Sequence, residues 1–439
     1  MKNNIKKPAS VRQADAYKSE YYDTLNHIWK DNSRLTEIRY FLDTAYNWSD
    51  EEQKQAQKPE VVILGTGIPE KLVMAAGAKP YWIIGGSLSS IAWSDDMVPR
   101  DTDPVSRSIL GYIHQPNGAD FSNAMFIIPL SSDSMRKIAF ELKAEGRKIC
   151  IVDIPPDKTD KRAQEKWLKQ MYSMTEAVAN HTGTRVTRKS VSNAVKRVSM
   201  ARRTLRQFLE VSRGCTDIIT DAARLLVQNT YYMTNSLDEW TQHIEALTEE
   251  TADFSRNMTD KNHNRPGVLL LGSPVIYPNY KVPFLVRDIG LDILNSADSA
   301  TLKTYIVYDR KTMRGSCRKL ICNIASVWYD YDASSAFVKN DILYRYVSWL
   351  IKKGDIEGVV YHVLKGQIEY DFELERFETL LSKYSIPVFR LETDYQYQDV
   401  EQLRIRMEAF SEMLVQNRYR AANERSQYKT IGKEVKKAS

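Results

Sequence analysis

Cysteine and histidine carry much of the nucleophilic and metal chemistry of proteins, and this chain of 439 residues has few of either. Its four cysteines are scattered along the chain: Cys150, Cys215, Cys317 and Cys322. No CxxC pair occurs, which excludes a zinc ribbon, and so few cysteines argue against a disulfide framework. Cys317 and Cys322, the closest pair, stand in a segment that we predict to be extended, on opposite faces of a strand. We expect all four to be buried or incidental thiols.

Local signatures of catalysis or nucleotide binding do not supply a reaction either. The six histidines occur singly, and neither a nucleophile elbow nor an HExxH motif is present. Gly65-Thr66-Gly67 follows an apolar run but lacks the third glycine of a dinucleotide-binding turn, and a phosphate-binding loop is absent. We interpret these glycines as a tight turn that leads into a helix.

The elements that would position functional side chains form two α/β blocks. Apolar runs without polar alternation predict a parallel sheet covered on both faces in each block. In the first block Pro69 and Glu70 begin a helix and Gly77 ends it. The predicted strands of the first block are Val61–Gly65, Tyr81–Gly86, Phe126–Leu130 and Lys148–Ile154. Those of the second are Val268–Ile276, Leu291–Ser296, Lys303–Asp309, Glu357–Val363 and Pro387–Asp394.

Helical spacing dominates the section between the two blocks. Within Val191–Phe208 the apolar residues fall near one helical face: Val191, Val195, Val198, Leu205 and Phe208. Five basic residues lie between them, and we interpret these as a solvated face: Lys196, Arg197, Arg202, Arg203 and Arg206. A last helix carries an apolar face that we expect to pack on the second block: Leu403, Met407, Phe410 and Leu414. This helix and Tyr329–Asp332 are also candidates for a subunit interface.

The predicted fold class is α/β, with two flavodoxin-like (Rossmann-like) parallel-sheet lobes, a helical section between them and an interlobe cleft, where ligands of such proteins bind. The expected divisions are an N-terminal helical segment (1–58), a first lobe (59–160), the helical section (161–259), a second lobe (260–397) and a C-terminal helix and tail (398–439).

Composition narrows the class of protein further. Lys and Arg total 62 against 56 Asp and Glu, and a net charge of +6 over the whole chain is too dilute to indicate nucleic-acid binding. The N-terminal residues lack the apolar core of a secretory signal, and no run approaches the roughly 20 apolar residues of a membrane span. We expect a cytoplasmic protein without a membrane partner.

Several segments, in order, resemble the subunits of the 2-hydroxyacyl-CoA dehydratase and benzoyl-CoA reductase family, and the chain is similar to a 2-hydroxyglutaryl-CoA dehydratase D-component. The resemblance covers about Val61 to Leu414. Its pieces are Pro69-Glu70 with the following AAGA and Pro80, PRDTDPVSRS (99–108), FIIPLSSDSMRKI (126–138) with VDIPP, LLLGSPVI (269–276), GVVYHVLKGQ (358–367), and IPVFRLETDY (386–395) followed by LRIRMEAFSEML (403–414). The last piece is the most specific.

The resemblance implies a [4Fe–4S] cluster held by three cysteines in the interlobe cleft. The matching positions here are Asp103, Ser132 and Gln367, and none is a cysteine. Flanking residues still match the family pattern: Pro104, Arg107, Ser108, Asp133 and Lys365. We expect the last four of these to lie near the cleft. Clusters of this kind need soft thiolate donors, so we expect no cofactor on this chain and no metal at these positions.

Two hypotheses of function follow from the resemblance. In the first, the chain is a cluster-free, non-catalytic subunit that pairs with a homologous [4Fe–4S]-bearing subunit and an ATP-dependent activator, in a lyase that acts on an acyl-CoA ligand. In the second, the chain is a stand-alone binding protein for an acyl-CoA or another small ligand, or an enzyme with a different polar or hard-metal site built from Asp103, Ser132, Gln367 and Asp133. Substrate identity has no marker in the sequence.

Overall fold

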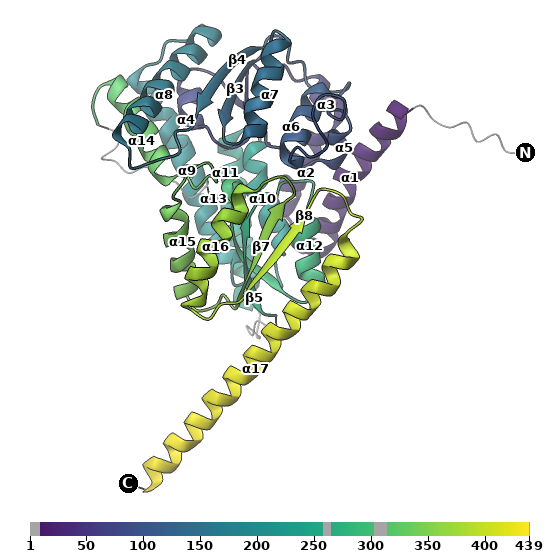
Figure 1. The fold of residues 1–439 in the computed structure, drawn as a ribbon, viewed down its shortest axis with the longest axis vertical. Helices are drawn as coiled ribbons and strands as arrows, with labels where there is room; N and C mark the ends of the chain where they lie inside the picture. The colour runs from purple at the N-terminus through teal and green to yellow at the C-terminus, as the bar shows by residue number, and fades with distance from the viewer. Residues whose placement is uncertain (1–8, 258–264, 303–313, 439) are drawn as a thin grey trace, which may run out of the picture.

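Two four-stranded sheets, each entirely parallel, form the centres of two lobes (Figure 1). The computed structural model describes residues 9–257, 265–302 and 314–438. The first sheet has the order β2-β1-β3-β4 and the second the order β6-β5-β7-β8. The strands are β1 (Val61–Leu64), β2 (Pro80–Ile83), β3 (Met125–Leu130), β4 (Lys148–Asp153), β5 (Gly267–Gly272), β6 (Asp292–Ala297), β7 (Gly358–Leu364) and β8 (Val388–Thr393).

The predicted strands of the two α/β blocks are confirmed wherever the structure describes them. β1, β5 and β7 are buried along their whole length, because helices cover both faces of each sheet. The predicted strand at Lys303–Asp309 lies outside the described residues.

Helices surround the two sheets and fill the section between them (Figure 1). Those before β5 are α1 (Ala9–Asn32), α2 (Ile38–Ser49), α3 (Glu51–Gln55), α4 (Glu70–Ala75), α5 (Leu88–Ile91), α6 (Pro104–His114), α7 (Asp133–Ala144), α8 (Lys161–Thr182), α9 (Arg188–Ser212), α10 (Asp221–Asn229), the 3₁₀ turn η1 (Thr230–Tyr232) and α11 (Leu237–Asn257). Those after β5 are α12 (Lys281–Asp288), α13 (Ser299–Leu302), α14 (Cys317–Tyr331), α15 (Asp341–Lys352), α16 (Glu369–Ser382) and α17 (Val400–Ala438).

Helix α9 corrects one interpretation of the sequence. Its apolar residues are buried as expected, but Arg202, which we assigned to a solvated face, is fully buried. The Arg202 guanidinium donates to Glu70 Oε1 at 2.5 Å, and the Tyr231 hydroxyl donates to the same oxygen at 2.8 Å. Glu70 does lie in the first turn of α4, yet its carboxylate is buried against Arg202. A buried cation requires such a partner, and the partner is distant in sequence.

Helix α14 corrects a second prediction. Cys317 and Cys322 lie on this helix and not on an extended strand. Ser316 caps it by accepting from the Lys319 amide, and apolar residues spaced three and four apart point inward. Trp328 on this helix stacks on Trp167 of α8 at a centroid distance of 4.9 Å, so α14 packs on the helical section.

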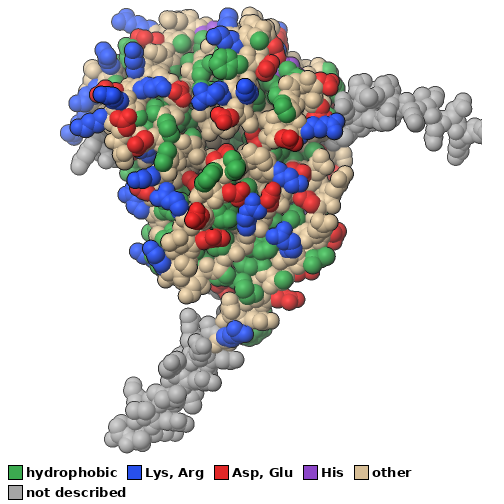
Figure 2. All heavy atoms as spheres, in the orientation of Figure 1, with side chains coloured by type: hydrophobic (Ala, Val, Ile, Leu, Met, Phe, Trp, Pro, Cys, Tyr) green, Lys and Arg blue, Asp and Glu red, His purple; other side chains and the backbone are tan. Residues whose placement is uncertain are grey.

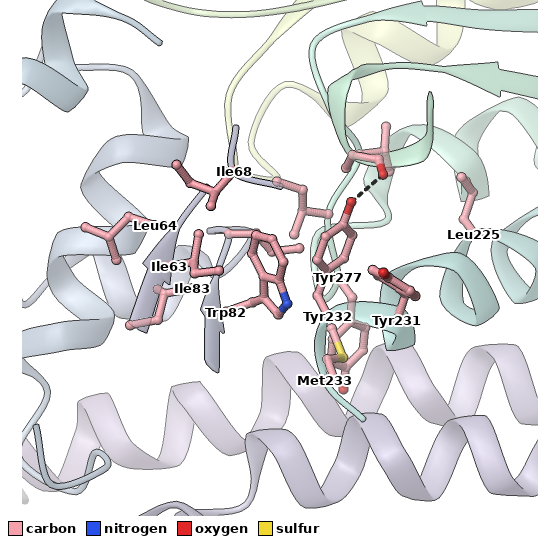
Figure 3. Close-up of a cluster of buried hydrophobic side chains, with 14 of the residues drawn as sticks. Ile63, Leu64, Ile68, Trp82, Ile83, Leu225, Tyr231, Tyr232, Met233 and Tyr277 are labelled. Atoms are coloured by element: carbon pink, nitrogen blue, oxygen red, sulfur yellow. Dashed lines mark hydrogen bonds between the residues drawn. The ribbon is translucent and has the colours of Figure 1, made fainter. Parts of the chain in front are cut away.

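Close packing joins the two lobes along a seam. Trp82 of β2 meets Tyr232 edge to face at 5.3 Å, and the Tyr232 hydroxyl donates to the Ala300 carbonyl of the second lobe at 2.6 Å (Figure 3). Gly86 has φ +107°, and a Cβ there would lie 2.4 Å from the Tyr277 carbonyl oxygen. Only glycine permits that backbone approach between the lobes.

The C-terminal helix α17 lies against the second lobe and then continues beyond it (Figure 1). The expected apolar face is buried against α12 and β8, which confirms that it packs on this lobe. The second candidate for a subunit interface was Tyr329–Asp332. Its Tyr329 is also buried, and the hydroxyl donates to the Pro155 carbonyl at 2.7 Å. No helix in the described ranges has the length and apolar character needed to cross a membrane.

The buried ion pair makes a prediction about stability. Arg202→Met leaves the Glu70 carboxylate buried without its cation, so we expect a loss of about 3–5 kcal/mol in the free energy of unfolding, measured with urea. The control Arg203→Met changes an exposed residue on the same helix and should alter stability by no more than about 0.5 kcal/mol. Equal losses in the two variants would contradict the assignment.

Candidate functional site

A polar cavity of about 80 Å³ lies between the lobes, at the carboxyl ends of the strands. Each sheet has its topological switch point there, between β1 and β3 in the first sheet and between β5 and β7 in the second. The turns that follow these strands contribute Gly65–Gly67, Ser131–Ser132, Pro274 and Gln367 to the cavity wall. Ligand sites of doubly wound α/β proteins form at such crevices, so the geometry marks this cavity as the candidate site.

The structure brings together the three positions that the sequence singled out. Asp103, Ser132 and Gln367 all line the cavity. Asp103 is the N-cap of α6, where its Oδ1 accepts from the Ser106 amide at 2.9 Å and Pro104 occupies the first helical position. Ser132 is the N-cap of α7 and accepts from the Met135 amide at 3.2 Å. Two helix N-termini therefore point at the cavity, and each is capped by one of these side chains.

Gln367 approaches from the other lobe. Its Nε2 donates to Asp103 Oδ1 at 3.3 Å across the seam, while its Oε1 is buried without a hydrogen-bond partner among the described residues. The preceding Gly366 has φ +86°, and a Cβ there would lie 3.0 Å from the Asp101 carbonyl oxygen. The turn after β7 is thus held tightly against the loop that carries Asp103.

The four predicted neighbours of the cleft are placed around the cavity, and none is among its described lining residues. Arg107 pairs with Asp95, and Ser108 accepts from the Ser87 amide at 3.0 Å. Asp133 is fully exposed at the start of α7, and Lys365 pairs with Asp394 at 3.3 Å. Arg107, Ser108 and Lys365 thus bind neighbouring residues, and none of the four is shown facing the cavity interior.

Carboxylates that the sequence analysis missed also line the cavity. Glu369 lies two residues after Gln367, and burial, together with the neighbouring carboxylates of Asp103 and Asp133, raises its pKa. The carboxylate residue Asp332 and the phenol residue Tyr370 also belong to the cavity wall. The sequence offered one signal that Glu369 belongs to the site, namely its position shortly after a predicted parallel strand. Asp332 follows a helix, so no such signal marked it.

A buried carboxyl supports the wall from behind. Glu373 lies on α16 and accepts from Asn340 Nδ2 at 2.8 Å. Asn340 also donates to the carbonyl of Ser334, which lines the cavity, and to that of the adjacent Ala333. Burial raises the pKa of Glu373 from its ordinary value of 4.5 to about 7. The folded protein therefore favours the neutral carboxyl below about pH 7.

The donor set at the cavity does not fit an iron–sulfur cluster. Asp103, Ser132 and Gln367 offer carboxylate, hydroxyl and amide groups, whereas such clusters bind soft thiolates. Burial raises the pKa of Cys150, on β4, to about 11, and Cys215 donates its thiol to the Val211 carbonyl. None of the four cysteines is among the described lining residues, and the described residues contain no group of three or more His, Cys, Asp or Glu side chains that could hold a metal ion.

These features define a class: chains with two parallel-sheet lobes, a helical section and a site where the two switch points meet. The family model of the 2-hydroxyglutaryl-CoA dehydratase D-component matches residues 66–414, and the chain belongs to this family. The resemblance inferred from the sequence is confirmed.

Two relatives agree with this assignment. A protein of Escherichia coli (strain K12) that bears the name of a dehydratase subunit, YjiM, is 22% identical over 378 residues, which cover 82% of this chain and 93% of the relative. The (R)-phenyllactyl-CoA dehydratase beta subunit of Clostridium sporogenes is 21% identical over 350 residues, which cover 79% of this chain and 89% of the relative.

The raised pKa of Glu373 makes a prediction about pH. Because the folded state holds this proton more tightly than the unfolded state, the free energy of unfolding should fall as pH rises from about 4.5 to about 7. Glu373→Gln removes that penalty and retains an acceptor for Asn340. We expect it to stabilise the chain by on the order of 2 kcal/mol at pH 8 and by little at pH 4.5.

Urea unfolding at the two pH values measures this difference. Glu375→Gln, at an exposed position on the same helix, is the matched control and should show no such pH dependence. A stabilisation by Glu373→Gln that is the same at both pH values would contradict the assignment.

Proposed function

We propose that this chain is a cluster-free, non-catalytic subunit of a 2-hydroxyacyl-CoA dehydratase-type complex, and that it pairs with a homologous subunit that bears a [4Fe–4S] cluster. In that role it keeps the family scaffold and supplies surfaces to the complex. An ATP-dependent activator and an acyl-CoA ligand belong to the same proposal as partners of the complex.

The observation that carries the proposal is the chemistry of the three matching positions. Each side chain is engaged in the chain's own structure, because Asp103 and Ser132 cap helices and Gln367 donates to Asp103. The missing thiolates are replaced by groups that satisfy local hydrogen-bonding needs and bridge the lobes. Both helix ends therefore keep a side-chain acceptor for their free backbone amides.

Two further observations support the proposal. The cavity has a volume of about 80 Å³, whereas pockets that hold drug-sized ligands measure roughly 300–1,000 Å³. It is therefore too small to enclose a substrate of that size. The Clostridium sporogenes relative is named as a beta subunit, and this chain matches most of its length. We therefore favour a role beside a second subunit.

The alternative of a hard-metal site at the same position has less support. Asp103 and Ser132 already use oxygen atoms to cap helices, and no suitable group of three metal ligands occurs in the part of the chain that the structure describes. The alternative of a stand-alone binder differs from the subunit hypothesis in assembly, and assembly can be measured directly.

Anaerobic reconstitution with iron and sulfide tests the donor set. The unmodified chain should take up no stoichiometric cluster, whereas Asp103→Cys, Ser132→Cys and Gln367→Cys combined should bind one, because these positions line a single cavity at two helix N-termini that stabilise thiolates. Iron and sulfide analysis with visible absorption is the measurement. A cluster in the unmodified chain would overturn the proposal. Asp103→Ser combined with Gln367→Ser, which gives serine at all three positions, is the control.

Co-expression tests the assembly. A tagged copy of this chain, expressed together with a family member that retains the three cysteines, should retain that member at a one-to-one ratio through affinity and size-exclusion chromatography. The iron of the complex should all belong to the partner. Elution of this chain alone, with the partner folded and loaded with iron, would favour a stand-alone binding protein.

A further inference from the structure

A second and larger cavity, of about 350 Å³, is lined by residues of α9 and α15, among others. Its volume falls within the range of small-molecule pockets, roughly 300–1,000 Å³. Most of its wall is apolar, and the apolar residues come from four elements or the turns beside them: Leu209, Leu302, Ala333, Ile342 and Leu343. An apolar concavity of this size on a folded chain is a candidate binding site.

The cavity is separate from the interlobe site, although one segment borders both. Along 331–334 the side chains alternate: Tyr331 and Ala333 line the larger cavity, whereas Asp332 and Ser334 line the interlobe cavity. The backbone at Asp332 is extended, with φ −66° and ψ 133°, so successive side chains point to opposite sides. This segment is the partition between the two cavities.

Aromatic side chains form one rim of the larger cavity. Trp349 is 48% exposed, and its ring lies 5.8 Å from that of Tyr346 with an interplanar angle of 28°. Lys353 Nζ lies 4.1 Å from the centroid of the Trp349 ring. A half-exposed indole with a cation above it offers both a flat apolar surface and a positive charge to a ligand.

Polar groups are few, and two of them are buried without hydrogen-bond partners among the described residues. Arg213 is nine-tenths buried; its Nη2 pairs with Asp355 at 2.6 Å, but its Nε has no partner. Asn295 Oδ1 has none either. Such groups cost free energy when they stay unsatisfied, so each is a place where a polar ligand atom would be stabilised.

The charges at the cavity favour an anion with a single charge. Asp355 neutralises Arg213, which leaves Arg206 and Lys353 against Glu210 among the described lining residues. The remaining excess is one positive charge. A polyanion such as an acyl-CoA would place several negative charges against this small excess, and the apolar wall would not accommodate them.

We propose that this cavity binds an amphipathic monocarboxylate, with an aromatic or branched apolar body against Trp349 and the apolar wall and the carboxylate toward Lys353 and Arg213. Only the partition at 331–334 separates the bound ligand from the interlobe cavity at this place. The binding site is built from residues outside the three substituted positions, so it is independent of the subunit role proposed above.

Isothermal titration calorimetry with the full chain tests this site with 3-phenylpropionate as the probe. Saturable one-to-one binding is expected, and 3-phenylpropan-1-ol, which lacks the charge, and propionate, which lacks the ring, should each bind at least about tenfold more weakly. Trp349→Ala should weaken binding of 3-phenylpropionate by about five- to tenfold.

Two lysine variants at the C-terminal end of α15 test the contribution of the positive charge. Lys353→Gln should weaken 3-phenylpropionate about threefold or more and leave 3-phenylpropan-1-ol unchanged, whereas Lys352→Gln, at an exposed neighbour outside the cavity, should change neither. These positions are at the surface, and thermal unfolding should match that of the unmodified chain. No saturable binding at millimolar probe, or binding unaffected by both Trp349→Ala and Lys353→Gln, would overturn the proposal.

Discussion

All eight described strands run parallel within their sheets, and the site depends on this constraint. In a parallel sheet every strand-to-helix turn lies at the same edge, so the sequence after each strand arrives at one place. Two such edges face each other here, with the close approaches at Gly86 and Gly366 holding them together. Residues separated by more than 260 positions, Asp103 and Gln367, therefore become hydrogen-bond partners.

Helix N-termini explain what the substituted residues do at that seam. The free amides and the dipole of a helix favour a negative or hydrogen-bond-accepting group at the N-terminus. A thiolate, a carboxylate and a hydroxyl all meet that requirement, but only the thiolate also suits iron–sulfur chemistry. Asp103 and Ser132 thus preserve the local fold of α6 and α7 while changing the donor set of the cavity.

The surface of the molecule agrees with the small net charge of the chain. The face in Figure 2 shows acidic and basic side chains interspersed over much of its area.

The parts of the fold that could be predicted were those encoded by neighbours in sequence. The buried runs at β1, β5 and β7 and the apolar face of α9 needed only local periodicity. Arg202 was wrongly placed in solvent because its partner, Glu70, lies 132 residues away and nothing local marks the pair. The segment at Cys317 was wrongly read as extended, since its cap and its packing on α8 outweigh the composition of a few residues.

The sequence by itself determined the family, the two parallel-sheet lobes and the three positions where thiolates are missing, because short motifs and apolar periodicity are local properties of the chain. The tertiary structure alone decided which side chains share a cavity: it joined Asp103 to Gln367, added Glu369 and Asp332, left Arg107 and Lys365 outside, and formed the apolar cavity beside Trp349. Distances across a seam depend on how whole lobes pack, and no short stretch of sequence contains that information.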